Sequence, residues 1–320
     1  MMKPHFRKDI LSSNWVIVSD LRDRRPNDYQ FSNIKCPFCP GNEKETPPEI
    51  FSLTDKNKWI LRIVPNKYPA IECITKEFFE VDGIYKKEYL CGVHEVVIET
   101  PKHNLNIHEI KHYGKVLEVF ALRIRELYKI KGVKYVIVFR NHGIKAGASL
   151  RHPHSQIIAL PLLPVRVEDE LMHFSKYRLK NKNCLMCDII KNEINIKKRV
   201  LFKSNNFIAF HPFASRFNFE IMIAPINHQP HYWMEKNFDE LSSIVRYVFS
   251  RLHKCIDDIS YNLVIHTAPL NFKDFHWHIE ILPKLAMPAG FEWGSGFFIN
   301  SISPEKACMV LKKGKKIKIY

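Results

Sequence analysis

The sequence contains no hydrophobic run of the roughly 20 residues that a membrane-spanning helix needs. Its first residues, Met1 to Asn14, also lack the apolar core of a secretory signal. We therefore expect a protein of the cytoplasm that has no membrane partner.

Glycine-rich phosphate-binding loops are missing as well, because GIKAGAS at residues 143–149 has the spacing of neither a P-loop nor a dinucleotide-binding turn. The 49 Lys and Arg give a formal net charge of +16 but form no arginine-rich block. This charge favours anionic partners such as nucleotides, sugar phosphates or nucleic acid. Nucleic acid fits least well, and we predict no binding to it, since no basic stripe with interleaved aromatic residues is present.

Four of the eight cysteines form two Cys-x-x-Cys pairs, CPFC at residues 36–39 and CLMC at residues 184–187. In a cytoplasmic chain such pairs are typical of metal sites or redox centres rather than of disulfides. The other four have aromatic and apolar neighbours, so we expect buried thiols at Cys73, Cys91, Cys255 and Cys308.

The two halves of the chain repeat the same order of motifs. HEVVIETPKHN at residues 94–104 aligns with FEIMIAPINHQ at residues 219–229. Residues 135–161 then align with residues 261–283, and both stretches read as strand, loop, His-x-His, strand and proline. A Cys-x-x-Cys pair precedes each set, so the repeat covers most of the chain.

Between these motifs each half has an amphipathic pattern that predicts a helix, over residues 106–130 and 236–257. Strands joined by hairpins, with one long helix per half, favour an α+β fold of antiparallel sheets. We predict two such halves, residues 1–165 and 166–320. A charged helix or linker over about residues 162–183 joins them.

Each half contains two cysteines and two histidines at corresponding positions. The second histidine follows the first by 49 residues in one half and by 48 in the other. Two thiolates and two imidazoles suit a tetrahedral metal ion and leave no open position for catalysis. We predict two structural sites, the first for Zn²⁺ and the second for Zn²⁺ or Fe²⁺, held by Cys36, Cys39, His103 and His152 and by Cys184, Cys187, His228 and His276.

The stretch SLRHPHSQIIALP at residues 149–161 places another histidine beside one of these ligands. Residues two apart in a strand face the same side, so His154 lies next to His152 with its own ring unligated. A neutral imidazole can attack phosphorus without an auxiliary base. Ser155 and Gln156 add donors for the non-bridging oxygens of a phosphate group. The pattern predicts a histidine nucleophile for phosphoryl chemistry.

Six motifs along nearly the whole chain carry a more specific signal: NWVIVSDLRDRRP (14–26), CPFCPGNE (36–43), WILRIVPNKYPA (59–70), HEVVIETPKHN, GASLRHPHSQ (147–156) and GFE (290–292). Together they resemble the galactose-1-phosphate uridylyltransferase family, the transferase branch of the histidine-triad superfamily. The resemblance implies two histidine-triad-like halves, a homodimer and a role in galactose metabolism.

The resemblance also implies a reaction. A nucleoside monophosphate moves between a nucleotide sugar and hexose 1-phosphate, with His154 as the covalent carrier and Gln156 at the phosphates of that intermediate. Arg22 and Arg25 correspond to phosphate-binding arginines, a role that suits the forked guanidinium group. Asn66 corresponds to a residue near the base and ribose.

Two implications concern the second half. Glu292 corresponds to a residue that contacts the sugar hydroxyls, in the family across the dimer interface. His278 is the counterpart of His154, and Glu280 stands in the place of Gln156. We therefore expect the second half to be catalytically silent.

The sequence departs from the family at Leu150-Arg151, where Asn-Pro is usual, and at Ala286, where a lysine typically helps to hold the hexose phosphate. These features are similar to the ADP-glucose:phosphate adenylyltransferase subgroup, so the nucleobase and the sugar stay open. Other classes also stay open: a zinc-stabilised nucleic-acid or nucleotide-binding protein, a histidine-triad hydrolase, and two zinc modules without catalysis. Gln156 argues against the hydrolase, since hydrolytic triads usually have a third histidine there.

Overall fold

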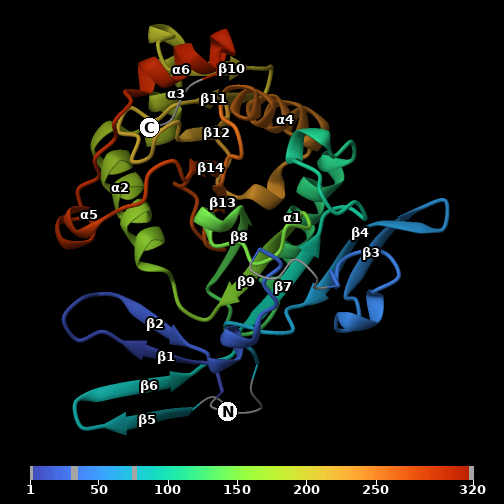
Figure 1. The fold of residues 1–320 in the computed structure, drawn as a ribbon. Helices are drawn as coiled ribbons and strands as arrows, with labels where there is room; N and C mark the ends of the chain where they lie inside the picture. The colour runs from blue at the N-terminus through green and yellow to red at the C-terminus, as the bar shows by residue number, and fades with distance from the viewer. Residues whose placement is uncertain (1–2, 30–34, 74–77, 317–320) are drawn as a thin grey trace.

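The computed structural model describes residues 3–29, 35–73 and 78–316. Its centre is one antiparallel sheet that runs through both halves of the chain (Figure 1). The strands of this sheet are β3 (Phe51–Asp55), β4 (Lys58–Pro65), β7 (Val93–Ile98), β8 (Tyr135–His142), β9 (His154–Leu160), β10 (Val200–Lys203), β11 (Phe207–Phe210), β12 (Ile221–Pro225), β13 (Tyr261–His266) and β14 (His278–Pro283).

The strand order is β10-β11-β12-β14-β13-β8-β9-β7-β4-β3. The two halves meet where β8 pairs with β13, from Val138 opposite Ile265 to His142 opposite Tyr261. Outward from this pair, β9 and β7 on one side correspond to β14 and β12 on the other. The α+β fold with duplicated halves is therefore confirmed, and the sheets of the two halves join into one. The domain division at residue 165 stays a prediction.

The helices are α1 (Tyr113–Leu127), α2 (Val165–Asn181), α3 (Leu185–Ile196), α4 (Phe238–Cys255), α5 (Gly290–Ser295) and α6 (Pro304–Lys313), with short 3-10 helices η1 (Asp20–Arg24), η2 (Glu43–Glu45), η3 (Ile107–Glu109), η4 (Ile144–Ala146) and η5 (Tyr232–Met234). The two helices predicted by periodicity are α1 and α4, and the charged junction is α2. No helix in the described ranges is long and apolar enough to cross a membrane.

Helices α1 and α4 cover one face of the large sheet. Their apolar side chains, among them Phe120 and Leu252, share a buried cluster with Val97, Ile157 and Ile279 of the sheet. These sheet residues alternate with polar ones such as Gln156 and Glu280, because successive strand residues face opposite sides. The face away from α1 and α4 is therefore the one that carries the polar groups of interest.

A second sheet lies beneath the first in Figure 1, near the N-terminus. It consists of β1 (His5–Lys8), β2 (Trp15–Val18), β5 (Phe78–Asp82) and β6 (Tyr85–Tyr89), in the order β2-β1-β6-β5. Strand β2 leads directly into η1, which carries Arg22. This small sheet thus supports the segment in which the sequence placed the phosphate-binding arginines.

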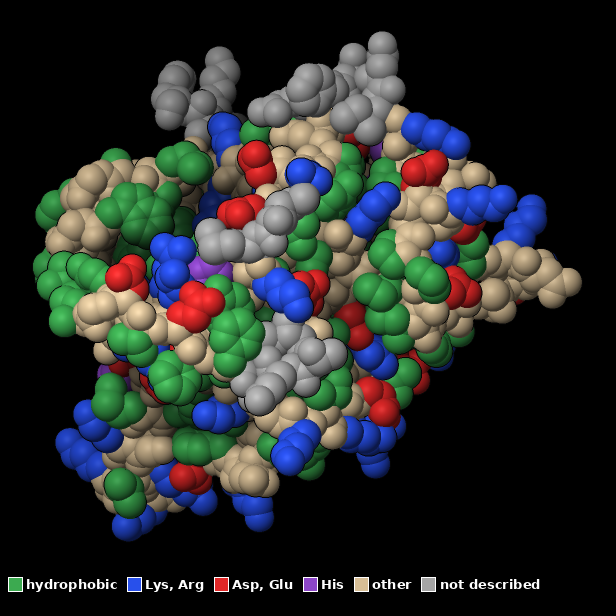
Figure 2. All heavy atoms as spheres, turned by 90° about the horizontal axis from the view of Figure 1, so that it is seen from below, with side chains coloured by type: hydrophobic (Ala, Val, Ile, Leu, Met, Phe, Trp, Pro, Cys, Tyr) green, Lys and Arg blue, Asp and Glu red, His purple; other side chains and the backbone are tan. Residues whose placement is uncertain are grey.

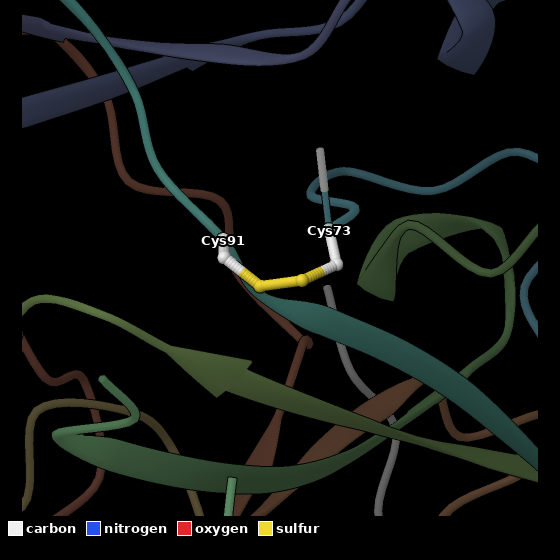
Figure 3. Close-up of a disulfide and its surroundings, with 2 residues drawn as sticks. All are labelled: Cys73 and Cys91. Carbon is white, nitrogen blue, oxygen red and sulfur yellow. A yellow bond between two sulfur atoms is a disulfide. The ribbon is translucent and has the colours of Figure 1, made fainter. Parts of the chain in front are cut away.

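The prediction of buried thiols is wrong for Cys73 and Cys91, which form a disulfide (Figure 3). Cys91 lies two residues before β7, and Cys73 lies seven residues after Asn66, so the bond closes the chain around the β5–β6 hairpin. The neighbours of a cysteine in sequence do not reveal which cysteine it meets in space. Cys255 and Cys308 are free and buried, as predicted.

Candidate active site

The four ligands predicted for the first metal site lie together in the structure. The Sγ atom of Cys39 is 3.3 Å from Nδ1 of His103 and 3.6 Å from Nδ1 of His152, and Sγ of Cys36 is also 3.6 Å from the latter. Ligands of a tetrahedral Zn²⁺ lie about 3.3–3.8 Å apart, so this donor set fits the ion. Nε2 of His152 faces the carbonyl of Thr100 at 2.8 Å, which fixes the ring.

The second predicted set also lies together, with all four ligand atoms within 4.8 Å of one another. Cys184 is the residue before the first turn of α3 and Cys187 lies in that turn, whereas the first pair lies in a turn outside any helix. Nδ1 of His276 is 3.8 and 3.6 Å from the two sulfur atoms, and its Nε2 faces the carbonyl of Pro225 at 2.9 Å. Both clusters can therefore hold a metal ion in the same way.

His154 is the first residue of β9 and lies beside the first metal cluster without joining it. Pro153 separates His154 from His152. Because proline has no backbone N–H to donate to a neighbouring strand, β9 begins at the residue after it. Nδ1 of His154 donates to the carbonyl of His152 at 2.8 Å, which leaves Nε2 with its lone pair. Burial lowers the pKa of His154 to about 4. The ring is therefore neutral at pH 7 and can act as a nucleophile.

His154 is 8% exposed, and its exposed part lines a cavity. Arg22, Arg25, Asn66 and Gln156 line the same cavity, so the structure brings together five of the residues singled out from the sequence. They come from η1 and the residue after it, the end of β4 and the start of β9.

Arg22 and Arg25 make no ion pair with any described carboxylate. Arg22 donates from Nη1 to the carbonyl of Tyr68 at 3.1 Å, and Nε of Arg25 donates to the carbonyl of Arg22. Burial and the charge of Arg25 lower the pKa of Arg22 to about 10, which leaves it protonated at neutral pH. Two uncompensated cations beside a neutral imidazole attract an anionic ligand such as a diphosphate.

The structure corrects the expectation for Ser155. Its side chain points to the face covered by α1, where it is 1% exposed and donates to Oε1 of Glu99 at 2.6 Å. Glu99 in turn pairs with the buried Arg140. The strand alternation that puts His154 and Gln156 in the cavity excludes the residue between them. Ser155 therefore supports the strand from behind and cannot bind phosphate through its hydroxyl.

Sequence reasoning missed several residues around the cavity. Lys35, Lys67 and Asn141 line it, as do residues 147–149. His94 lies just behind it and contacts Gln156. The motif HEVVIETPKHN drew attention to the metal ligand His103. Strand alternation puts His94 on the same face as Val96, and this signal could have placed His94 on the cavity face. The two lysines carry no pattern that a single sequence reveals.

Glu292 lies away from the His154 cavity, whose described lining includes no residue of the segment 287–299. Its carboxylate accepts from the N–H of Ala289 at the start of α5. Glu292 and Ala286 line a separate small hollow with Arg216 and Phe217. Within one chain, the structure does not bring Glu292 to the other predicted site residues.

The counterpart of the site in the second half is filled by an ionic network. His266 lies between Glu170 at 3.1 Å and Glu280 at 3.2 Å, and Glu280 also pairs with Arg166 and Arg216. Burial opposes a charge here, but the two carboxylates raise the pKa of His266 to about 9.

The ring of His278 stacks on His266 at 4.7 Å between centroids. Glu170, His266, His278 and Glu280 could also act as metal ligands, since their ligand atoms lie within 4.8 Å of one another. Glu280 already has two arginine partners. The network therefore satisfies its charges without an added cation, and its residues His278 and Glu280 hold the positions that correspond to His154 and Gln156 in the first half.

A neutral imidazole and two guanidinium groups without a described carboxylate partner share one cavity of a duplicated antiparallel fold, an arrangement that suits a nucleotide-handling transferase. A family model for the N-terminal domain of galactose-1-phosphate uridyl transferase matches residues 2–164, and one for a domain of unknown function (DUF4921) matches residues 85–315.

The chain is similar to ADP-glucose phosphorylase of Arabidopsis thaliana, with 33% identity over 97% of this chain and 93% of the relative. It is 31% identical to galactose-1-phosphate uridylyltransferase of Thermotoga maritima, over 96% of this chain and 97% of the relative. The crystal structure of an ADP-glucose phosphorylase from A. thaliana with bound ADP-glucose has a TM-score of 0.76, with 31% identity over 97% of this chain and 99% of that one.

The chain belongs to the galactose-1-phosphate uridyl transferase family, as the motifs had predicted. It is accordingly a nucleotidyltransferase.

Proposed function

We propose that this chain transfers a nucleoside monophosphate between a nucleotide sugar and hexose 1-phosphate, as UDP-glucose:galactose-1-phosphate uridylyltransferases do. The observation that carries the proposal is the unligated ring of His154, held by the His152 carbonyl in a cavity that also contains Arg22 and Arg25. Relatives named galactose-1-phosphate uridylyltransferase match nearly the whole chain and support it.

The reaction proceeds in two displacements. Nε2 of His154 attacks the α-phosphorus of the nucleotide sugar, an N–P bond forms, and the P–O bond to the departing hexose 1-phosphate breaks. Nδ1–H keeps its bond to the carbonyl of His152, which stabilises the positive charge of the substituted ring. Arg22, Arg25 and Gln156 bind the phosphate oxygens, and Asn66 lies at the nucleoside. A phosphate oxygen of the acceptor then attacks phosphorus and restores the free imidazole.

A second candidate reaction uses ADP-glucose and inorganic phosphate with the same residues. The relative named ADP-glucose phosphorylase matches 97% of this chain, and Leu150, which departs from the uridylyltransferase pattern, lines the cavity. Arg151 is not among the described residues that line the cavity, and its guanidinium lies over the ring of Tyr29 at 4.6 Å. A smaller acceptor would also be consistent with Ala286 in place of a lysine.

Covalent labelling distinguishes these reactions. The protein is incubated separately with UDP-glucose and ADP-glucose carrying ³²P in the α-phosphate, then denatured and counted. We expect base-stable, acid-labile label on the chain from UDP-glucose. Label from ADP-glucose alone would show that the second candidate reaction, and not the first, is the one that the protein catalyses. Absence of label from both would overturn the proposal of a covalent intermediate.

We further propose that the active protein is a homodimer in which Glu292 of one copy completes the cavity of the other. The segment around α5 is apolar and exposed, with Trp293 77% and Phe297 70% exposed, as expected of an interface. This arrangement would explain why Glu292 lies outside the His154 cavity of its own chain.

Trp293→Ser tests the dimer. Since buried tryptophans dominate interfaces, the substitution is expected to weaken dimerisation by about ten-fold or more and to lower turnover in parallel. Sedimentation velocity and activity are measured over a range of protein concentrations. Phe213→Ser, at an exposed side chain far from α5 in sequence, is the control. A wild-type chain that is monomeric and fully active would contradict the dimer.

The remaining assignments extend this proposal. We propose Zn²⁺ in the first cluster and Zn²⁺ or Fe²⁺ in the second, both structural, since each offers four protein ligands. We propose a cytoplasmic location, where the cysteines of the two clusters stay reduced for metal binding, although Cys73 and Cys91 form a disulfide. On the face drawn in Figure 2, the described Lys and Arg side chains are spread among hydrophobic ones rather than gathered in a stripe, which favours small anionic substrates over nucleic acid.

A further inference from the structure

His94 links the two parts of the cavity that bind different ends of a nucleotide in the proposed function. It lies on β7, is 4% exposed, and faces the same side of the sheet as Gln156 on β9, because Val96 pairs with Gln156 in the ladder. Its backbone carbonyl accepts from the N–H of Asn66 at 2.8 Å. The side chain therefore stands between the strand of the nucleophile and the loop that follows β4.

The tautomer of His94 follows from one contact. The backbone N–H of Ala70 donates to Nδ1 at 3.0 Å, and a backbone amide is always a donor. Nδ1 must therefore carry the lone pair, and in the neutral ring Nε2 carries the hydrogen. Burial lowers the pKa of His94 to about 4, which keeps the ring neutral at pH 7.

This tautomer fixes the amide of Gln156. Nε2 of His94 lies 2.9 Å from Oε1 of Gln156, and a nitrogen that bears hydrogen needs an acceptor at that distance. The carbonyl oxygen of Gln156 is thus held against His94, and its NH₂ group is left for the cavity. Asn66 is oriented by a different contact, since its Oδ1 accepts from the N–H of Tyr68 at 2.9 Å. Its Nδ2 lies 3.1 Å from Nε2 of His94, but in this tautomer both atoms bear hydrogen, so Nε2 is shared with no acceptor other than Gln156.

We propose that His94 is a positioning residue, which turns the NH₂ group of Gln156 toward the phosphate and fastens the nucleoside loop at Ala70. The inference rests on the proposed nucleotidyl transfer and adds to it how the NH₂ group of Gln156 is oriented toward the phosphate. The two ring nitrogens have separate tasks: Nε2–H orients Gln156 for the transfer step, and Nδ1 holds the loop that binds the nucleoside.

Two substitutions separate these tasks, because the amide atoms of Asn and Gln lie as many bonds from Cβ as Nδ1 and Nε2 of histidine do. His94→Asn can still accept from Ala70 but cannot reach Gln156. It is expected to slow labelling of the chain at saturating nucleotide sugar by about 10- to 100-fold, with KM little changed. His94→Gln can still donate to Gln156 but leaves Ala70 unpaired. It is expected to raise KM with the labelling rate within about three-fold of wild type.

Rapid-quench labelling with ³²P nucleotide sugar measures both quantities, with thermal unfolding recorded for each variant. Equal losses of rate and affinity in both variants would indicate a structural role only and overturn the inference. Should both variants fail to fold, ¹⁵N NMR of the histidine-labelled wild type decides, since His94 must show a protonated Nε2 and a bare Nδ1. The opposite tautomer would overturn the inference. Wild-type protein that takes up no label would count against the proposed function. A His94→Asn variant that is labelled at the wild-type rate would count only against the proposed role of His94.

Discussion

His154→Gly is expected to abolish the covalent label and to lower nucleotidyl transfer by about 10⁴-fold or more, the order of loss seen when a covalent nucleophile is deleted. Fold and metal content should change little, because His154 donates only to the carbonyl of His152 and is not part of the Cys36 cluster. The measurement is the rate of hexose 1-phosphate release from the nucleotide sugar, with metal analysis of the purified variant.

The second half of the chain offers the matched control. His278 occupies the equivalent strand position, and its Nδ1 faces the carbonyl of His276 at 3.1 Å, as that of His154 faces His152. It stacks on His266 within the ionic network rather than lining the cavity. His278→Gly should therefore keep the label while losing some thermal stability. Equal activity of His154→Gly and wild type would contradict the assignment of His154 as the nucleophile, and absence of activity from both would favour two zinc modules without catalysis.

Cys36→Ser and Cys184→Ser are expected to have unequal effects on catalysis although they disturb equivalent clusters. Loss of a four-ligand structural ion costs several kcal/mol of folding free energy, so each variant should unfold about 10 °C or more below wild type. Cys36→Ser should also abolish labelling, because its partner His152 carries the carbonyl that holds His154. Cys184→Ser should still label below its unfolding temperature.

Metal content by mass spectrometry, unfolding by calorimetry and labelling by scintillation counting together test this asymmetry. We expect one ion fewer per chain in each variant. Normal labelling by Cys36→Ser without its ion would contradict the link between the first cluster and the nucleophile. Loss of labelling in folded Cys184→Ser would show that the second cluster also acts on the cavity.

Patterns with a fixed period could be predicted from the sequence. The helices α1 and α4 and the position of His154 beside His152 follow from spacing along one helix or strand, and the two Cys-Cys-His-His sets follow from the repeat. The repeat strengthened the prediction of the two metal sites, since the spacing of the two histidine ligands is nearly the same in both halves, 49 and 48 residues. Arg22, Arg25 and Asn66 reached the cavity as the family resemblance implied.

Contacts between distant segments could not be predicted. The pairing of β8 with β13, which joins the two sheets, depends on edge strands that either half could have left unpaired. The Cys73–Cys91 disulfide depends on where two loops meet. The wrong expectation for Ser155 has a different origin: the alternation that placed His154 beside His152 was not extended along the strand, where it puts Gln156 on the face of His154 and Ser155 on the opposite face. The role of His94 required hydrogen-bond partners from two other segments, the loop after β4 and strand β9.

The central claim is that one imidazole carries the nucleotide. Wild-type protein is mixed with the nucleotide sugar that labels it, quenched in base and digested, and the peptide that contains His154 is analysed by mass spectrometry. We predict a mass increase of one nucleoside monophosphate on His154 that disappears when the acceptor is added before the quench. A stable adduct on another residue, or turnover of substrate with His154 unmodified throughout, would contradict the account.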